Sequence, residues 1–139
     1  MRFGGFTSKD RIATMQLDVS PAEVLDRWSI LDLKKANISN PNAQASLQRQ
    51  LDHLAQIWHD ADLPAKESLE PFHTLQEVNR TLWDTEDALR AHEARGDFDA
   101  AFIALARSVY QLNDARSTAK RAINELLAAA QDEWKSYGG

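Results

Sequence analysis

Hydrophobic residues recur every three or four positions along most of the chain, which is the spacing of amphipathic helices. Prolines and Gly96, the one glycine between residues 6 and 137, divide this pattern into long segments. The segments are rich in Ala, Leu, Gln and Glu, which favours helix over strand. The sequence predicts four helices, over residues 21–38, 42–58, 70–95 and 98–136. The expected fold class is therefore all-α, a helical bundle of about four helices.

Residues that cap helices support the expected ends of these segments. Residues 20–23, Ser-Pro-Ala-Glu, have the form of a capping box with proline at the first helical position. Gly96 suits the left-handed position that ends many helices. Asp97 suits an N-cap, so we expect the fourth helix to open at Phe98. In the second helix, the predicted apolar face consists of Leu47, Leu51, Leu54, Ile57 and Trp58.

A turn as short as Gly96–Asp97 would force the third and fourth helices to pack antiparallel, as a long C-terminal helical hairpin. Residues equally far from this turn then lie at equal height. This rule predicts three pairs of neighbours: Trp83 with Tyr110, Glu86 with Arg107, and Asn79 with Asp114.

Polar residues interrupt the apolar seams of this hairpin. Burying them is costly unless each is hydrogen-bonded or paired. These residues form a polar stripe, for which three interpretations are open. It is a structural polar network, a pocket for an anionic ligand lined by Arg107, Arg116 and Lys120, or solvated surface. The candidate binding or structural cluster comprises Asn79, Trp83, Glu86, Asp87, Arg107, Tyr110, Asn113, Asp114, Arg116 and Lys120.

Composition excludes several classes of function. A chain of 139 residues fits a single domain, expected at 18–137, after a loosely held arm at 1–17. The formal net charge of −5 argues against a nucleic-acid binder, and the lack of cysteine excludes disulfides and zinc–thiolate sites. The sequence suggests neither a secretory signal nor a membrane span, so we expect a cytoplasmic protein.

Charged residues are distributed unevenly along the predicted hairpin. Residues 84–99 carry a net charge of −4, whereas residues 107–121 carry +3. Glu77, Asp84 and Asp87 fall near one helical face, but the facing helix is mostly basic there, so we expect no metal site and no cofactor. The surplus positive charge can hold a phosphate or a sugar carboxylate.

Residues 78–127 resemble an uncharacterised bacterial all-helical family. The resemblance rests on five motifs: Asn-x3-Trp-Asp-x-Glu-Asp from Asn79, Gly-Asp-Phe from Gly96, Ala-Arg-x-Val-Tyr from Ala106, Asn-Asp from Asn113 and Lys-Arg-x-Ile-Asn from Lys120. Residues 19–38 and 133–137 also fit, while residues 40–68 carry no motif and Trp28 and Ser29 depart from the pattern. The resemblance implies no assigned activity. It does imply that members of the family are often encoded near genes for glycosyltransferases or lipopolysaccharide synthesis.

Two classes of function remain open, and whether the protein is an enzyme is undecided. The first is a non-catalytic interaction or accessory protein, linked through the resemblance to cell-surface polysaccharide synthesis. The second is a small-molecule enzyme or binder that uses the polar stripe for a phosphorylated or anionic ligand. A closed network of satisfied partners would favour the first, and an open pocket the second.

A homodimer is the expected assembly. The last helix keeps an apolar stripe beyond the start of its hairpin partner, formed by Leu126, Leu127, Ala130 and Trp134. An exposed stripe of this kind usually meets another surface. Alternatively, Trp28 and Leu31 of the first helix cover this stripe within one chain.

Overall fold

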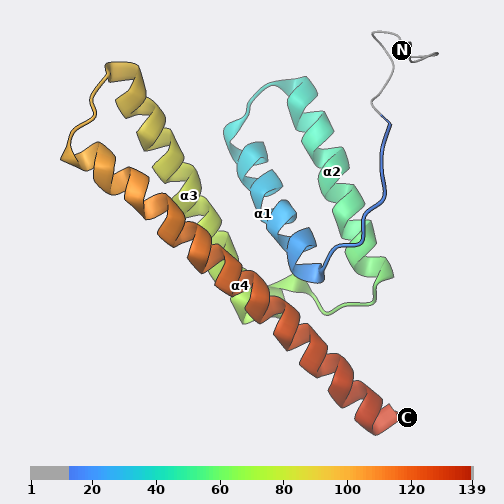
Figure 1. The fold of residues 1–139 in the computed structure, drawn as a ribbon. Coiled ribbons are helices and arrows are strands. Elements are labelled where there is room, and N and C mark those ends of the chain that lie inside the picture. The colour runs from blue at the N-terminus through green and yellow to red at the C-terminus, as the bar shows by residue number, and fades with distance from the viewer. Residues whose placement is uncertain (1–12, 139) are drawn as a thin grey trace, which may run out of the picture.

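The structure is a computed structural model that describes residues 13–138, with side chains described as far as residue 132. Its helices are α1 (Pro21–Asn37), α2 (Pro41–Asp60), α3 (Glu70–Arg95) and α4 (Ala100–Gly138), with a short 3-10 helix η1 (Lys66–Ser68) before α3 (Figure 1). No strand occurs in the described residues. The prediction of an all-α bundle with a C-terminal hairpin is confirmed. Most of the arm expected at 1–17 lies outside the described residues.

Side-chain caps fix the starts of the first two helices. The Ser20 hydroxyl accepts a hydrogen bond from the Glu23 N–H at 3.4 Å. The Asn40 side chain accepts from Asn42 and Ala43 at 2.9 and 3.1 Å. In each case a proline occupies the first helical position, where a missing N–H costs nothing. These caps explain why two separate helices form on either side of residues 38–40.

The turn between α3 and α4 is longer than the sequence pattern predicts. Gly96 does adopt the left-handed conformation that ends α3, with φ +64°. Asp97, however, is not the N-cap of α4, and Phe98 does not open it. Asp99 takes that role, since its carboxylate accepts from the Phe102 N–H at 3.0 Å. The link therefore spans residues 96–99, and α4 begins at Ala100.

The buried core lies where α1 meets the base of the hairpin, which is the end away from the turn at its tip. Its most deeply buried side chains are Leu25, Phe72, Leu75 and Ile123. On α2, the predicted apolar face is buried except at Ile57, which is 41% exposed. The core therefore joins α1 and α2 to the N-terminal half of α3 and the middle of α4.

The outer half of the hairpin projects away from this core. Between residues 86 and 118 no side chain is buried, although both helices continue through this stretch. Figure 1 shows α3 and α4 running past α1 and α2 as a two-helix arm, and α4 continuing past the start of α3 at its other end. The arm thus has only its own two helices to cover its seam.

Candidate functional site

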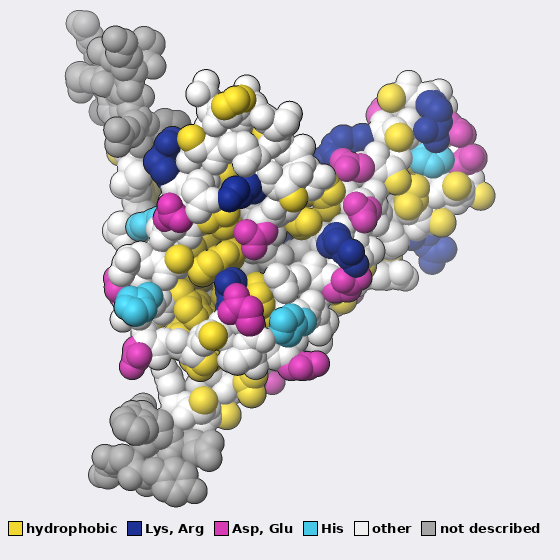
Figure 2. Space-filling model, turned by 180° about the vertical axis from the view of Figure 1, so that it is seen from behind, with side chains coloured by type: hydrophobic (Ala, Val, Ile, Leu, Met, Phe, Trp, Pro, Cys, Tyr) yellow, Lys and Arg dark blue, Asp and Glu magenta, His cyan; other side chains and the backbone are white. Residues whose placement is uncertain are grey.

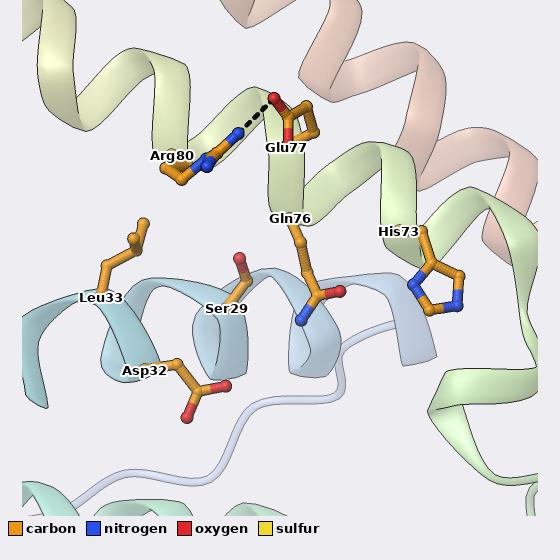
Figure 3. Close-up of a pocket in the computed structure, with 7 residues that line it drawn as sticks. All are labelled: Ser29, Asp32, Leu33, His73, Gln76, Glu77 and Arg80. Atoms are coloured by element: carbon orange, nitrogen blue, oxygen red, sulfur yellow. Dashed lines mark hydrogen bonds and ion pairs between the residues drawn. The ribbon is translucent and has the colours of Figure 1, made fainter. Parts of the chain in front are cut away.

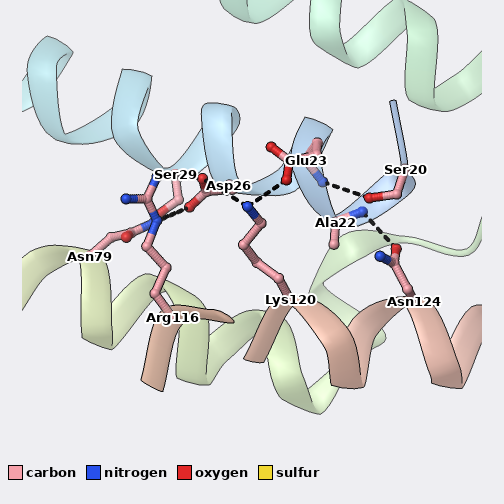
Figure 4. Close-up of polar contacts among 9 residues, drawn as sticks. All are labelled: Ser20, Ala22, Glu23, Asp26, Ser29, Asn79, Arg116, Lys120 and Asn124. Atoms are coloured by element: carbon pink, nitrogen blue, oxygen red, sulfur yellow. Dashed lines mark hydrogen bonds and ion pairs between the residues drawn. The ribbon is translucent and has the colours of Figure 1, made fainter. Parts of the chain in front are cut away.

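A buried carboxylate on α1 lies at the centre of a polar cluster between the helices. Asp26 is 4% exposed. Arg116 of α4 donates to it twice, from Nε to Oδ1 at 2.9 Å and from Nη2 to Oδ2 at 2.5 Å. Asn79 of α3 donates from Nδ2 to Oδ1 at 3.0 Å. Asp26 therefore joins three helices through one side chain, as Figure 4 shows.

Further polar contacts extend this cluster along α1. Lys120 Nζ lies 2.5 Å from Glu23 Oε1 and 3.9 Å from Asp26 Oδ2. The Asn124 side chain accepts from the Ala22 N–H at 3.0 Å, satisfying a free donor of the first turn of α1. The capping box predicted at 20–23 is therefore only half formed, because Glu23 pairs with Lys120 while Ser20 caps the helix.

The protonation of the cluster follows from these contacts. Burial alone would raise the pKa of Asp26, but hydrogen bonds from Arg116 and Asn79 and the charges of Arg116 and Lys120 bring it below its ordinary value. The hydrogen bond to Asp26 raises the pKa of Arg116, against the effect of its own burial. At neutral pH, Asp26 is a carboxylate and Arg116 a cation, so the pair is ionic.

The polar groups of the cluster satisfy one another. In the described residues, no buried side-chain nitrogen or oxygen lacks a hydrogen-bond partner. Both oxygens of Asp26 accept from neighbouring side chains, so its carboxylate is already engaged. Such an arrangement holds helices in register, because removing one member would leave a buried charge or polar group unpaired.

The predicted site residues divide into two groups. Asn79, Arg116 and Lys120 belong to the cluster around Asp26. The others lie elsewhere on the hairpin: Glu86 and Asp87 pair with Arg90 at 3.9 and 2.9 Å, Trp83 is half-buried, and Arg107, Tyr110, Asn113 and Asp114 are exposed. The structure thus brings together three of the ten residues.

The predicted pairs across the hairpin are displaced. Among the described ion pairs, Glu86 meets Arg90 of its own helix and not Arg107. Asn79 shares Asp26 with Arg116, two residues beyond the predicted Asp114. A four-residue link in place of a two-residue turn accounts for a shift of this size.

Sequence reasoning missed the residues that α1 contributes. Ala22, Asp26 and Ser29 follow each other at helical spacing, and all three are buried. An aspartate between two small residues on the buried face of a helix is the signal that could have identified Asp26. The Asn79 side-chain amide donates to the Ser29 hydroxyl at 3.3 Å, so Ser29 also belongs to the cluster.

Two open clefts flank the cluster. One, of about 430 Å³, is lined by Glu23, Asp26, Arg27, Ile30, Leu31, Lys34, Gln50 and Arg116. The other, of about 480 Å³, lies between α1 and α3 and is lined by Ser29, Asp32, Leu33, His73, Gln76, Glu77 and Arg80 (Figure 3). Burial raises the pKa of Asp32 against the charges of Lys66 and Lys35. Only the first cleft has more cationic than anionic side chains.

A histidine and two aspartates also approach each other at the hairpin turn. His92 Nδ1 lies 4.0 Å from Asp97 Oδ2 and 3.8 Å from Asp99 Oδ1. The same nitrogen is 2.9 Å from the Asp97 carbonyl oxygen, and the Asp99 carboxylate caps α4. These contacts explain the cluster as part of the turn.

In the part of the chain that the structure describes, no helix has the length and apolar character needed to cross a membrane. A model of one family, described as "Family of unknown function (DUF6165)", matches residues 15–138. No curated protein and no solved structure matches the chain. The family match identifies an uncharacterised domain over most of the sequence.

Proposed function

The chain belongs to DUF6165, a family of unknown function, and we propose that it is a non-catalytic helical interaction protein. The observation that carries this proposal is that the polar groups of the cluster already bind one another. Asp26 has partners on two other helices, and its acceptor atoms are occupied. A group that is fully used in holding helices together is poorly suited to bind a substrate or transfer a proton.

The proposal divides the molecule into two parts with different roles. The cluster locks α1 onto the base of the hairpin, and the hairpin arm, with no buried side chain between residues 86 and 118, supplies accessible surface. Accessible apolar and charged side chains on a rigid support are what a protein interaction needs.

The cellular setting is a further part of the proposal. The resemblance of the sequence motifs supports an accessory role in bacterial cell-surface polysaccharide synthesis, carried out in the cytoplasm. Deleting the gene in its host and comparing surface polysaccharide with and without a plasmid copy would test this role. Unchanged polysaccharide would contradict it.

A second candidate function is the binding of a small anionic ligand. It is favoured by the cleft beside Arg116, where Arg27 and Lys34 add positive charge next to the apolar side chains of Ile30 and Leu31. Here the ligand would meet Arg27 and Lys34, because Arg116 is already paired with Asp26.

Thermal unfolding with a panel of phosphosugars and nucleotides distinguishes the two functions. The interaction protein is expected to show the same Tm with every compound. The double variant Arg27→Ala/Lys34→Ala removes the two cations of the cleft that lie outside the cluster and leaves the cluster intact. A rise in Tm that the wild type shows and this variant loses would establish binding of an anionic ligand in the cleft and favour the second function over the interaction protein. The variant Arg49→Ala, on the exposed surface of α2, is the control for a simple loss of positive charge.

A further inference from the structure

The outer half of the hairpin has an incompletely covered apolar seam. Leu89, Phe102 and Leu105 are only half-buried, although Phe102 lies against His92 of the neighbouring helix. Ile103 and Tyr110 of α4 are 54% and 56% exposed. An isolated pair of helices leaves much of its apolar surface in water, whereas a third or fourth helix would cover it.

The exposed side chains lie on one side of the hairpin. Tyr110 and Ile103 precede Asn124 by two and three heptads, so they share a helix face with a residue that contacts α1. On α3, Trp83 lies one turn beyond Asn79, which also contacts α1. We call this surface the outer face, defined by Trp83, Ile103, Ala106 and Tyr110. It continues, towards the tip, the surface that α1 covers at the base.

We infer that the outer face binds the outer face of a second copy of this chain, so that two hairpins form an antiparallel four-helix bundle. The inference deepens the proposed interaction role, on which it rests, by naming the partner. A two-fold interface requires a surface that is complementary to itself. The arm carries charge of both signs: residues 84–99 near the tip have a net charge of −4, whereas Arg107 and Arg121 of α4 are exposed cations nearer the base, where Arg116 and Lys120 are already paired with α1.

The position of α1 determines the orientation of the two copies. At the base of the hairpin this side is occupied by α1, through Asp26 and its contacts with Asn79 and Arg116. Two copies therefore cannot stack base on base. In the antiparallel arrangement, the tip of each hairpin points towards α1 of the other copy. The acidic tip of one copy then lies towards the exposed Arg121 of its partner.

The surface of the arm fits such an interface. Figure 2 shows acidic, basic and hydrophobic side chains intermixed on the projecting arm. Two hairpins joined in this way would resemble a four-helix bundle, in which antiparallel helices connected by short loops share one apolar core. The interface proposed here differs from the stripe at Leu126 and Ala130, because Leu127 of that stripe is already buried within the chain.

Light scattering after gel filtration tests this inference. The wild type is expected to have about twice the 15.6 kDa mass of the chain at micromolar concentration. Ile103→Glu and Tyr110→Glu should each weaken association about tenfold or more while leaving the helical circular dichroism unchanged. Ile57→Glu, the same substitution at a partly exposed site on α2, is the matched control and should remain dimeric. A monomeric wild type would overturn the inference.

Two further measurements test the interface and its orientation. Leu126→Glu changes the alternative stripe on α4, and loss of the dimer there but not in Ile103→Glu would overturn the inference. Because the chain has no cysteine, single spin labels can be placed by Ala106→Cys in the outer face and Ala94→Cys near the tip. An antiparallel dimer gives a short distance between labels at 106 and a longer one at 94. Equally short distances would overturn the antiparallel arrangement.

These outcomes are separate from those that test the proposed function. A monomer whose Tm does not respond to anionic compounds would remove the second copy as partner and leave the non-catalytic role. A dimer whose Tm rises with a phosphosugar would retain the second copy as partner and favour the anionic ligand as the function of the cleft.

Discussion

Arg116 of α4 binds both carboxylate oxygens of Asp26 of α1, across 90 residues of sequence. A bidentate arginine–carboxylate pair of this kind fixes orientation as well as distance. It sets α1 at one height on the hairpin. Asn79 and Lys120 then add contacts at the same place, so the register of three helices depends on one aspartate.

Asp26→Ala is expected to lower the free energy of unfolding by about 3–5 kcal/mol, because it leaves Arg116 and Asn79 without their partner in a partly buried site. Urea unfolding followed by circular dichroism measures this loss. Arg80→Ala is the control, since Arg80 pairs with Glu77 on the exposed surface of α3 and should cost less than about 1 kcal/mol.

The double variant Asp26→Leu/Arg116→Met tests the same prediction from the other side. Replacing both members of a buried pair by apolar residues often recovers stability that a single replacement loses. The double variant should therefore be more stable than Asp26→Ala. If the two lose stability equally, the loss does not come from an unpaired partner.

The pH dependence of stability should reveal the same carboxylate. The folded pKa of Asp26 lies below its ordinary value of 3.8, so its contribution is present above that value and is lost as the pH falls through the folded pKa. The difference in unfolding free energy between the wild type and Asp26→Asn should stay constant from pH 7 to about pH 5 and shrink below about pH 4. A difference that grows as the pH falls would contradict this assignment.

Asp32 should behave in the opposite way. Partial burial raises its pKa, and Lys66 and Lys35 offset this only in part, so ionising the Asp32 carboxyl costs more free energy in the folded than in the unfolded protein. Asp32→Asn should therefore raise the Tm at pH 7. This gain should disappear as the pH falls towards 3.8, where the wild-type side chain takes up a proton. A lower Tm of the variant at pH 7 would show that its contacts with the lysines dominate.

Local signals in the sequence were sufficient to predict the positions of the helices. Ser20 and Asn40 before prolines, and Gly96 after a long apolar period, act within a few residues of the ends that they determine. The predicted start of α4 was wrong, because Asp99 is as good a cap as Asp97 and only the packed turn selects it. That choice moved the predicted pairs across the hairpin.

Predicting the polar cluster required information that the sequence pattern of the hairpin does not contain. Asn79, Arg116 and Lys120 were recognised as polar residues near an apolar seam. Their common partner lies on α1, and the docking of α1 depends on contacts between segments far apart in the chain. The acidic residue at the α1 interface could be suspected from its buried neighbours Ala22 and Leu25, but its partners could not.

Glu86→Ala distinguishes the pair that Glu86 forms in the structure from the pair that the sequence pattern predicts. If Glu86 paired with Arg107 inside the seam, its removal would cost several kcal/mol. In the structure its side chain is about half exposed and lies 3.9 Å from Arg90. The expected loss of stability is therefore below about 0.5 kcal/mol, the usual value for an exposed i, i+4 pair. A urea-unfolding midpoint shifted as far as that of Asp26→Ala would show that Glu86 is part of the buried network.

Gly96→Ala tests the turn that sets the height of the hairpin. Gly96 has φ +64°, where a side chain strains the backbone, and an added Cβ would meet no atom within 4 Å. The cost should therefore come from conformation alone and be about 1–2 kcal/mol. Gly96→Asn should cost less, because asparagine tolerates the left-handed region better than alanine. Equal losses in the two variants would show that conformation at this residue does not control the turn. The comparison of both urea-unfolding curves with that of the wild type decides the question, since neither variant alters a charge or a buried contact.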